Sequence, residues 1–383
     1  AVSFILSVYW DCRPKEMTIG LDARFAQGKL TGVGKYIQAL ALGLAARHFK
    51  VVLFYLQKPQ LLIKEKGIKT VILPGNKYLW EQIYLPRALK REKVDLYHAA
   101  GNFGVPLFSN IPAVLTIHDL IPLLQKNYFN QAKIPVFSQK LYYWRTKTSI
   151  MKAQKIITDT YWTKKAIVDF FKTPPQKISV IYLDSSYPEE IDEKAYLQFD
   201  LERKKYLINN GGLDRRKNLP NLISAFALAE RKMPWLKLVI TGENPQLLPL
   251  LKKEVEEKKL TQKVIFTGFL EEKALWGLLK NAFCLCYPTL AEGFGLPLIE
   301  AFRTNTPVIA SKLPVLKEVG DGACLFVNPR QPQAIAQAII SLQNETLRQK
   351  LIISGQKQAQ KFSWEKTIEE TIKIYKKVIK NTT

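Results

Sequence analysis

Residues 288–301 read Pro288-Thr-Leu-Ala-Glu292-Gly-Phe-Gly-Leu-Pro-Leu-Ile-Glu300-Ala301. The apolar run that ends at Tyr287 predicts a strand before this stretch. Pro297 predicts a helix after it, because proline suits the first helical turn, where a backbone N–H has no partner. Gly293 and Gly295 let the backbone approach a ligand closely, and free amides at a helix start favour a phosphate. The stretch therefore predicts a strand, a phosphate-binding turn and a helix of an α/β fold.

Two carboxylates flank this turn. Glu292 lies in the turn and Glu300 lies eight residues later, in the following helix. Carboxylates accept hydrogen bonds from hydroxyls and are poor neighbours for phosphate, so we expect the pair to bind sugar or ribose hydroxyls on either side of a diphosphate. The alternative is a turn whose two glutamates have no function.

A second stretch, residues 209–222, joins a strand end, a glycine turn and a helix start around the cations Arg215-Arg216-Lys217. Cations that converge on a glycine-rich turn are typical of phosphate sites. We expect Arg216 and Lys217 to bind the diphosphate, beside Gly212. A solvated run of charges is the alternative.

Short β-rich runs alternate with longer amphipathic stretches on both sides of a polar segment. This alternation predicts parallel sheets covered by helices on both faces. We expect strands at residues 18–21, 51–55, 70–73, 96–98, 113–117, 155–158 and 178–181, and then at 206–209, 236–241, 264–267, 282–287, 307–310 and 324–327.

The expected fold is therefore α/β, with two doubly wound, Rossmann-like lobes and a cleft between them. The first lobe is residues 1–184, in which 1–16 are treated as a possible extension. Residues 185–205 are the linker, 206–362 the second lobe, and 363–383 a C-terminal amphipathic helix that crosses back to the first lobe.

The ends of the predicted strands in the first lobe carry further candidates. The loop at residues 28–36 places Gly32 and Gly34 before a helix, but it fits neither a dinucleotide fingerprint nor a P-loop, so a plain strand-to-helix turn stays open. His118 and Asp119 end a buried strand, and strand ends in open α/β sheets face the ligand crevice. His98 ends the previous strand and is at most a group that lines the cleft.

With these motifs in register, the chain resembles retaining glycosyltransferase family 4, the group 1 glycosyltransferases of GT-B fold. Glu292 and Glu300 match the Glu-x7-Glu signature of the family, with Gly293, Phe294, Gly295 and Leu296 inside it. The resemblance implies that Glu292 contacts the donor sugar, that Glu300 contacts the ribose, and that the amides between them hold the diphosphate.

The resemblance extends to the other candidates. It implies that Arg216 and Lys217 are the basic pair at the diphosphate, although many members carry a further Arg at the place of Gly212. It also implies that Gly32 and Gly34 approach the donor phosphate, and that His118 reaches the donor sugar.

Two matches are looser. Gly268 and Phe269 resemble the segment beside the nucleobase, although core packing of Phe269 is equally compatible. Residues 157–165 resemble a strand-end turn of the family, with Thr160 as a weak acceptor-side candidate and Thr163 as the expected helix cap.

The composition excludes several classes. Hydrophobic residues make up 47% of the chain, too many for a disordered protein, and no apolar run is long enough to span a bilayer. Four cysteines in 383 residues fit neither a disulfide framework nor a zinc site, which favours a reducing cytoplasm. No Asp-x-Asp pair or His/Asp cluster has metal-ligand spacing, so we expect no metal and no cofactor.

A net charge of +24 attracts phosphates, anionic lipid or nucleic acid, and charge alone does not choose among them. Aromatic and basic residues mix at 142–155 and at 77–91, which favours peripheral contact with an anionic membrane, such as the inner face of the plasma membrane. Helix packing beneath solvated lysines is the alternative.

The expected function is transfer of a sugar from a nucleotide-sugar, with GDP-mannose favoured, to a glycan or lipid-linked acceptor in surface polysaccharide assembly. The resemblance implies retention at the anomeric carbon. A basic nucleic-acid-binding protein and a catalytically silent sugar-nucleotide-binding protein are the alternatives. The cations follow no known nucleic-acid module, so we expect no nucleic-acid partner.

Overall fold

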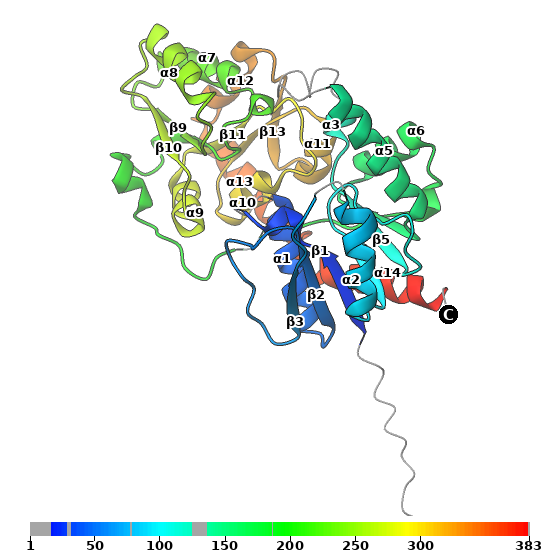
Figure 1. Ribbon diagram of the computed structural model, residues 1–383. Coiled ribbons are helices and arrows are strands. Elements are labelled where there is room, and N and C mark those ends of the chain that lie inside the picture. The colour runs from blue at the N-terminus through cyan, green and yellow to red at the C-terminus, as the bar shows by residue number, and fades with distance from the viewer. Residues whose placement is uncertain (1–16, 29–31, 77–78, 125–135, 186, 382–383) are drawn as a thin grey trace, which may run out of the picture.

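The computed structural model describes residues 17–28, 32–76, 79–124, 136–185 and 187–381. The predicted extension at residues 1–16 lies outside these ranges, as does part of the glycine loop, residues 29–31. The described chain folds into two lobes, each built on a parallel sheet with helices on both faces (Figure 1). The predicted α/β class with two doubly wound lobes is confirmed.

The first sheet has the order β3-β2-β1-β4-β5-β6-β7, all parallel. Its strands lie close to the predicted runs: β1 (Thr18–Asp22), β2 (Lys50–Tyr55), β3 (Ile68–Ile72), β4 (Leu96–Ala99), β5 (Ala113–Ile117), β6 (Lys155–Thr158) and β7 (Ile178–Val180). Its helices are α1 (Gly32–Ala45), the π-helix η2 (Trp80–Tyr84), α2 (Leu85–Arg91), α3 (Ile121–Leu124), α5 (Val136–Lys152) and α6 (Tyr161–Phe171), with short 3-10 turns η1 (Arg24–Ala26) and η3 (Pro175–Lys177).

The second sheet has the order β10-β9-β8-β11-β12-β13, again parallel. Its strands are β8 (Tyr206–Asn209), β9 (Lys237–Thr241), β10 (Val264–Gly268), β11 (Cys284–Tyr287), β12 (Val308–Ser311) and β13 (Cys324–Val327). Its helices are α7 (Leu219–Glu230), α8 (Leu248–Glu257), α9 (Glu272–Asn281), α10 (Leu296–Arg303), α11 (Pro314–Gly320), α12 (Pro332–Ser341) and α13 (Glu345–Ala359), with 3-10 turns η4 (Ala195–Phe199) in the polar segment and η5 (Arg215–Lys217) after β8.

Strand residues alternate between two cores, as expected for strands that are covered on both faces. In β2, Val51 and Leu53 face a core that includes α1, whereas Val52 and Phe54 face the core under α2. The α1-side core continues through α10 into the second lobe, so the two lobes share apolar packing.

The last helix, α14 (Trp364–Lys380), follows the second lobe but packs on the first. It contacts α1, β5 and β6, and Figure 1 shows it in red beside the blue and cyan strands. The packing is close: a Cβ added at Gly43 of α1 would come within 2.0 Å of Ile368 Cδ1. Ile368 and Tyr375 therefore complete the core of the first lobe.

The lobes also meet directly. The Glu318 carboxylate of α11 accepts hydrogen bonds from the backbone amides of Tyr161 (2.7 Å) and Trp162 (3.1 Å), at the start of α6. Lys35 of α1 forms an ion pair with Glu272 of α9 at 2.9 Å. The cleft described below is thus bordered by contacts between the lobes.

In both sheets the strand order reverses beside the first strand, between β1 and β4 and between β8 and β11. Ligands of open α/β sheets bind outside the carboxyl ends of the strands at such reversals. The turn after β8 carries Arg216, and the turn after β11 carries Glu292. The fold therefore brings residues that are far apart in the sequence to one edge.

Candidate active site

Lys217, Glu292 and Tyr287 form a hydrogen-bonded cluster in the second lobe, beside Arg216 and Gly293 in the sequence and the turns. The Lys217 Nζ lies 2.7 Å from Glu292 Oε2 and donates to the Tyr287 hydroxyl, which itself donates to Glu292. Burial alone would raise the pKa of Glu292, but the Lys217 ammonium and the Tyr287 hydroxyl outweigh it and lower that pKa. Glu292 is therefore held ionised.

Arg216 is tied to the same turn through its backbone. Its carbonyl oxygen accepts hydrogen bonds from the Leu290 amide (2.6 Å) and from Thr289 Oγ1 (2.9 Å). Its guanidinium lies 3.2 Å from the carboxylate of Asp214, which also caps the 3-10 turn. The cationic turn and the Glu292 turn are thus one rigid unit.

Glu300 is buried in α10 and accepts two hydrogen bonds. Ser185 Oγ lies 3.0 Å from Oε1, and Asn210 Nδ2 lies 2.6 Å from Oε2. Burial raises the pKa of Glu300. Ser185 and Asn210 were not predicted, since neither belongs to the Glu-x7-Glu stretch.

His118 lies at the end of β5, as predicted, and both of its ring nitrogens have partners. Nδ1 lies 2.8 Å from Asp159 Oδ2, and Nε2 lies 3.1 Å from the carbonyl oxygen of Ala100. Burial opposes the charged ring, but the Asp159 carboxylate outweighs it and raises the pKa of His118. This geometry suits an imidazolium that donates from both nitrogens. Asp159 was missed by sequence reasoning.

The turn after β11 touches the first lobe at Asp119. A Cβ added at Gly293 would lie 3.0 Å from the Asp119 Cβ and 3.2 Å from the carbonyl oxygen of His118. Burial raises the pKa of Asp119. A side chain at position 293 would therefore press on Asp119 and on the His118 backbone, where the lobes approach each other.

The two helix starts also face one another across the cleft. Gly32 is the first residue of α1, and a Cβ there would lie 3.4 Å from Leu296 Cδ1 at the start of α10. Gly34 is buried two residues further into α1. Gly295 caps α10 with a φ of 113°, in the left-handed region that favours glycine. The predicted glycine turns therefore direct two helix N-termini toward one space.

A third group of turns lies after β8, β9 and β10. A Cβ added at Gly212 would meet nothing within 4 Å, and Gly268 forms a bridge with Gly242, which packs on the Gly212 backbone. The side chain of Phe269 is 54% exposed. Core packing of Phe269, the alternative left open by the sequence, is therefore wrong.

Three candidate side chains do not face the cleft. His98 is fully buried; Nδ1 bonds the Tyr375 hydroxyl of α14 (2.6 Å) and Nε2 bonds Thr116 Oγ1 (2.7 Å), and burial lowers its pKa to about 3. His98 is a structural residue that joins α14 to the sheet, not a lining group.

The side chains of Thr160 and Phe294 also have structural roles. Thr160 caps α6 by accepting from the Thr163 amide at 3.0 Å, so the cap lies at Thr160 and not at Thr163 as predicted. Phe294 is buried against Tyr182 and Phe362. Only the backbone of Phe294 remains available to a ligand.

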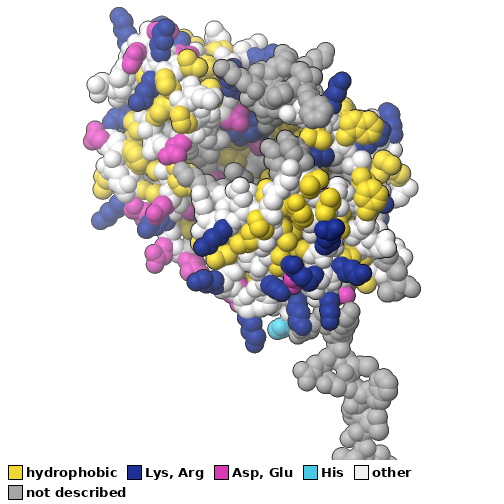
Figure 2. All heavy atoms as spheres, in the orientation of Figure 1, with side chains coloured by type: hydrophobic (Ala, Val, Ile, Leu, Met, Phe, Trp, Pro, Cys, Tyr) yellow, Lys and Arg dark blue, Asp and Glu magenta, His cyan; other side chains and the backbone are white. Residues whose placement is uncertain are grey.

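A cavity of about 190 Å³ lies where the lobes meet. Residues of the first lobe, His118 and Asp119 among them, line it together with Arg216 of the second lobe. Figure 2 shows the molecular surface hollowed between the lobes. Val33, the pair His118 and Asp119, and Arg216 bring three of the predicted site segments to this cavity, whereas residues 288–301 do not line it.

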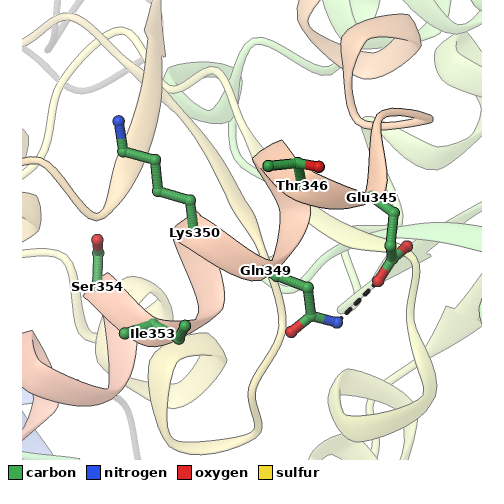
Figure 3. A pocket seen from close by; sticks show the side chains of 6 residues that line it. All are labelled: Glu345, Thr346, Gln349, Lys350, Ile353 and Ser354. Carbon is green, nitrogen blue, oxygen red and sulfur yellow. Dashed lines mark hydrogen bonds between the residues drawn. The ribbon is translucent and has the colours of Figure 1, made fainter.

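A wider hollow of about 570 Å³ lies along α13, which is distant in sequence from the Arg216 and Glu292 turns. Figure 3 shows that its lining side chains, from Glu345 to Ser354, stand on one helix, with a hydrogen bond between Gln349 and Glu345. None of them is a predicted site residue, so we assign the site to the cavity between the lobes.

Within the described ranges, no group of three or more His, Cys, Asp or Glu side chains is placed to hold a metal ion. In the same part of the chain, no helix combines the length and the apolar character needed to cross a bilayer. Cys284, Cys286 and Cys324 are free and buried.

Comparison with known proteins gives the family. The model of glycosyl transferases group 1 matches residues 193–380, and the model of glycosyltransferase family 4 matches residues 30–183. The chain is a group 1 glycosyltransferase. The predicted family is thereby confirmed, and the two matches cover the two lobes.

Two curated relatives of this glycosyltransferase illustrate the similarity. The O-antigen chain mannosyltransferase RfbU of Salmonella typhimurium is 30% identical over 62% of the chain and 66% of that protein. The O-antigen chain mannosyltransferase B of Escherichia coli is 27% identical over 87% of the chain and 84% of that protein. The chain thus aligns with just under two thirds of the first relative and most of the second.

Solved structures agree on the fold. Sucrose-phosphate synthase from Thermosynechococcus elongatus superposes with a TM-score of 0.78, covers 95% of the chain and 100% of its own, and is 20% identical. The two-lobed GT-B fold of this glycosyltransferase is thus confirmed.

Proposed function

We propose that the chain transfers a mannosyl unit from GDP-mannose to a glycan or lipid-linked acceptor, with retention at the anomeric carbon, during assembly of a cell-surface polysaccharide. Both relatives are named O-antigen chain mannosyltransferases, which supports mannose as the transferred sugar and a surface polysaccharide as the product. The observation that carries the proposal is the unit of Arg216, Lys217 and Glu292 beside the start of α10. It offers cations and backbone amides to a diphosphate and a carboxylate to the sugar.

In this proposal the nucleoside diphosphate is the leaving group. Arg216, Lys217 and the amides at the start of α10 stabilise the charge that develops on it, and their preorganisation lowers the barrier. The acceptor hydroxyl attacks the anomeric carbon on the face from which the diphosphate departs, and its proton passes to the departing phosphate oxygen. Glu292 and His118 orient the sugar.

The other candidates take donor-binding roles. Glu300, already hydrogen-bonded to Asn210, accepts from the ribose hydroxyls, and the exposed ring of Phe269 packs against the nucleobase. Since protein cations sit at the diphosphate, we also propose that no divalent metal is needed. Activity in EDTA equal to activity with added Mg²⁺ is the expected result; loss in EDTA would overturn this point.

We propose further that the first lobe contacts an anionic membrane from the cytoplasmic side. α5 carries Lys140, Lys147 and Lys152 without an acidic residue, and Trp144 is exposed among them, whereas Arg145 of the same helix pairs with Glu81. Figure 2 shows basic and hydrophobic side chains mixed over α5 and α6. Such mixed surfaces bind interfaces. The test is sedimentation of the chain with anionic and with neutral vesicles at low and high salt. Equal sedimentation with both kinds of vesicle, or sedimentation with anionic vesicles that salt does not change, would contradict membrane contact.

The transfer itself is tested with a panel of nucleotide-sugars. Purified chain and a mixed glycan acceptor are supplied with GDP-mannose and with UDP- and dTDP-sugars, and the released nucleoside diphosphate is measured. We expect the fastest release from GDP-mannose, and an α-linked product by NMR from this α-linked donor. A β-linked product would refute retention, and salt-dependent binding of nucleic acid without diphosphate release would favour the nucleic-acid alternative.

A further inference from the structure

Both oxygens of the Glu300 carboxylate are held by residues outside α10. Oε1 accepts from Ser185 Oγ at 3.0 Å, and Oε2 accepts from Asn210 Nδ2 at 2.6 Å. Ser185 lies where the chain crosses from the first lobe to the second, and Asn210 directly follows β8. A carboxylate has about four lone-pair sites, so one site remains on each oxygen after these two hydrogen bonds. Glu300 is thus a fixed acceptor with two positions still to fill.

Ser185 is fastened to α10 through the residue before it. Each carboxylate oxygen of Asp184 accepts from Arg303 Nη2 at 2.8 Å, and Oδ1 also accepts from the Ser185 amide at 2.7 Å. Arg303 follows Glu300 by three residues on the same helix, so the two side chains are neighbours on one helix face. Arg303 Nη2 also lies 3.3 Å from the carbonyl oxygen of Phe362, before α14. The crossing segment is therefore held on α10, and Ser185 keeps its place against Glu300.

The two carboxylates of this region differ in how their charge is balanced. Asp184 forms an ion pair with Arg303, and its side chain is 5% exposed. Glu300 is 6% exposed, but its hydrogen-bond donors are a neutral hydroxyl and a neutral amide. The charges that act on it from a distance, Lys35 and Glu272, have opposite signs and pair with each other. Burial of a charge without an ion pair is costly. A purely structural carboxylate would be better served by the pairing that Asp184 has, so the open positions of Glu300 favour a ligand.

A ribose offers what these positions need. Its 2′- and 3′-hydroxyls are vicinal O–H donors, and in the proposed function they donate to Glu300. A carboxylate that is free to rotate would bind a single hydroxyl nearly as well, because it can turn one oxygen toward that hydroxyl. A carboxylate fixed by Ser185 and Asn210 keeps both oxygens in place, so a missing hydroxyl leaves one buried acceptor position without a donor. Loss of either residue should therefore weaken the preference for the intact diol.

We propose that Ser185 and Asn210 are positioning residues that hold the Glu300 carboxylate for the ribose diol, and that the site thereby selects ribonucleoside over 2′-deoxyribonucleoside diphosphate donors. The inference rests on the proposed function and names the class of its donor. Sugars activated as dTDP derivatives fall outside this class. The chain crossing at Asp184 and Ser185 thus takes part in donor selection, besides joining the lobes.

The test compares GDP with 2′-deoxy-GDP by calorimetry on the full chain, or UDP with 2′-deoxy-UDP if the panel of nucleotide-sugars selects uridine. We expect the wild type to bind the ribonucleotide about tenfold more tightly, the ratio that loss of one hydrogen bond to a charged group gives. Ser185→Ala should lower this ratio to about threefold or less, through weaker binding of the ribonucleotide. Ser185→Thr, which keeps the hydroxyl, should restore the ratio. Asn210→Ala is the second variant, with the same expected result as Ser185→Ala.

Ser224→Ala is the matched control, because Ser224 Oγ donates to the Glu254 carboxylate at 3.4 Å between α7 and α8, and its ratio should equal that of the wild type. An unchanged ratio in Ser185→Ala or in Asn210→Ala, or an equal loss of affinity for both nucleotides, would overturn the inference. A wild type that binds both nucleotides equally would overturn it too, although diphosphate release would then still support sugar transfer. Absence of any nucleotide binding and of diphosphate release would instead refute the proposed function. Melting temperatures identify a variant that fails to fold, and the other variant then decides.

Discussion

Replacement of Lys217 tests the centre of the proposed site. In Lys217→Met the stem of the side chain is retained and the ammonium is lost. The variant leaves the Glu292 carboxylate, whose side chain is only 16% exposed, with the Tyr287 hydroxyl as its remaining partner in that unit. Stability and activity should therefore both fall, for different reasons.

The size of the stability loss follows from the burial of the pair. Removal of one partner from a buried ion pair costs about 3–5 kcal/mol, because the other charge is left unpaired. Glu292 keeps the Tyr287 hydroxyl, so we expect the lower end, about 3 kcal/mol. At ~2–4 °C per kcal/mol for a unit of this size, the melting temperature should fall by about 6–12 °C.

Activity should fall by about 10²–10³ in kcat, because a preorganised charge at the leaving group is lost. The double variant Lys217→Met with Glu292→Gln separates the two effects, since it removes the unpaired charge. It should recover much of the stability and none of the activity. Urea unfolding and diphosphate release measure the two quantities.

Lys35→Met is the matched control. Lys35 pairs with Glu272 at 2.9 Å, but the two side chains are 29% and 42% exposed. Exposed pairs contribute about 1 kcal/mol or less, so this variant should melt within a few degrees of the wild type. If Lys217→Met is as stable as Lys35→Met, or if the double variant is the least stable of the set, the buried pair does not have the energetic role argued above.

Three further predictions follow from the described contacts. Asp159→Asn should lower the free energy of unfolding, measured in urea, more at pH 6 than at pH 9. The pKa of His118 is raised in the folded chain, so the His118–Asp159 ion pair stabilises the fold below the unfolded pKa of His118, about 6.5. The pair loses that effect as the pH rises through the folded pKa of His118. An equal loss at both pH values would refute the charged pair. Phe269→Ala should weaken nucleotide binding by about tenfold in calorimetry, because a stacked ring is lost. The melting temperature should change little, because the ring is exposed. A large fall in melting temperature would show that Phe269 belongs to the core. Glu318→Ala should cost about 1–2 kcal/mol of unfolding free energy, since it removes the acceptor of the first two amides of α6, and an unchanged urea curve would contradict this.

The sequence predicted the sheets well because the signal is local. Strands buried on both faces appear as short apolar runs, and each predicted run corresponds to a strand, to within two residues at its ends. The turns at Glu292 and Lys217 were also found in sequence, since glycine, proline and helix starts leave a compact pattern. The α/β fold and the main turns of the site were therefore predictable.

The partners of the site residues were not predictable in the same way. Asp159 lies 41 residues after His118, and Ser185 lies 115 residues before Glu300. Tyr287 was read as the end of an apolar strand, although a tyrosine directly before the Glu292 turn is a usable signal. Such pairs depend on which strands become neighbours, and that is a property of the whole sheet.

Burial explains the wrong assignments. His98 ends a strand like His118, but α14 returns over that end of the sheet and its Tyr375 hydroxyl engages the ring. Thr160 was considered for the acceptor side because of its turn, yet the start of α6 needs its hydroxyl as a cap. The His98 ring is thus bonded by a segment distant in sequence, and the Thr160 hydroxyl is bonded by the adjoining backbone.

The return of α14 to the first lobe has a consequence during synthesis. Domains generally fold from the N-terminus as they leave the ribosome. Here Ile368 and Tyr375 fill the core beside α1, so the lobe that is made first stays incomplete until nearly the whole chain has emerged. The nascent first lobe should expose the apolar face of α1 throughout translation of the second, and depend on chaperones over that interval.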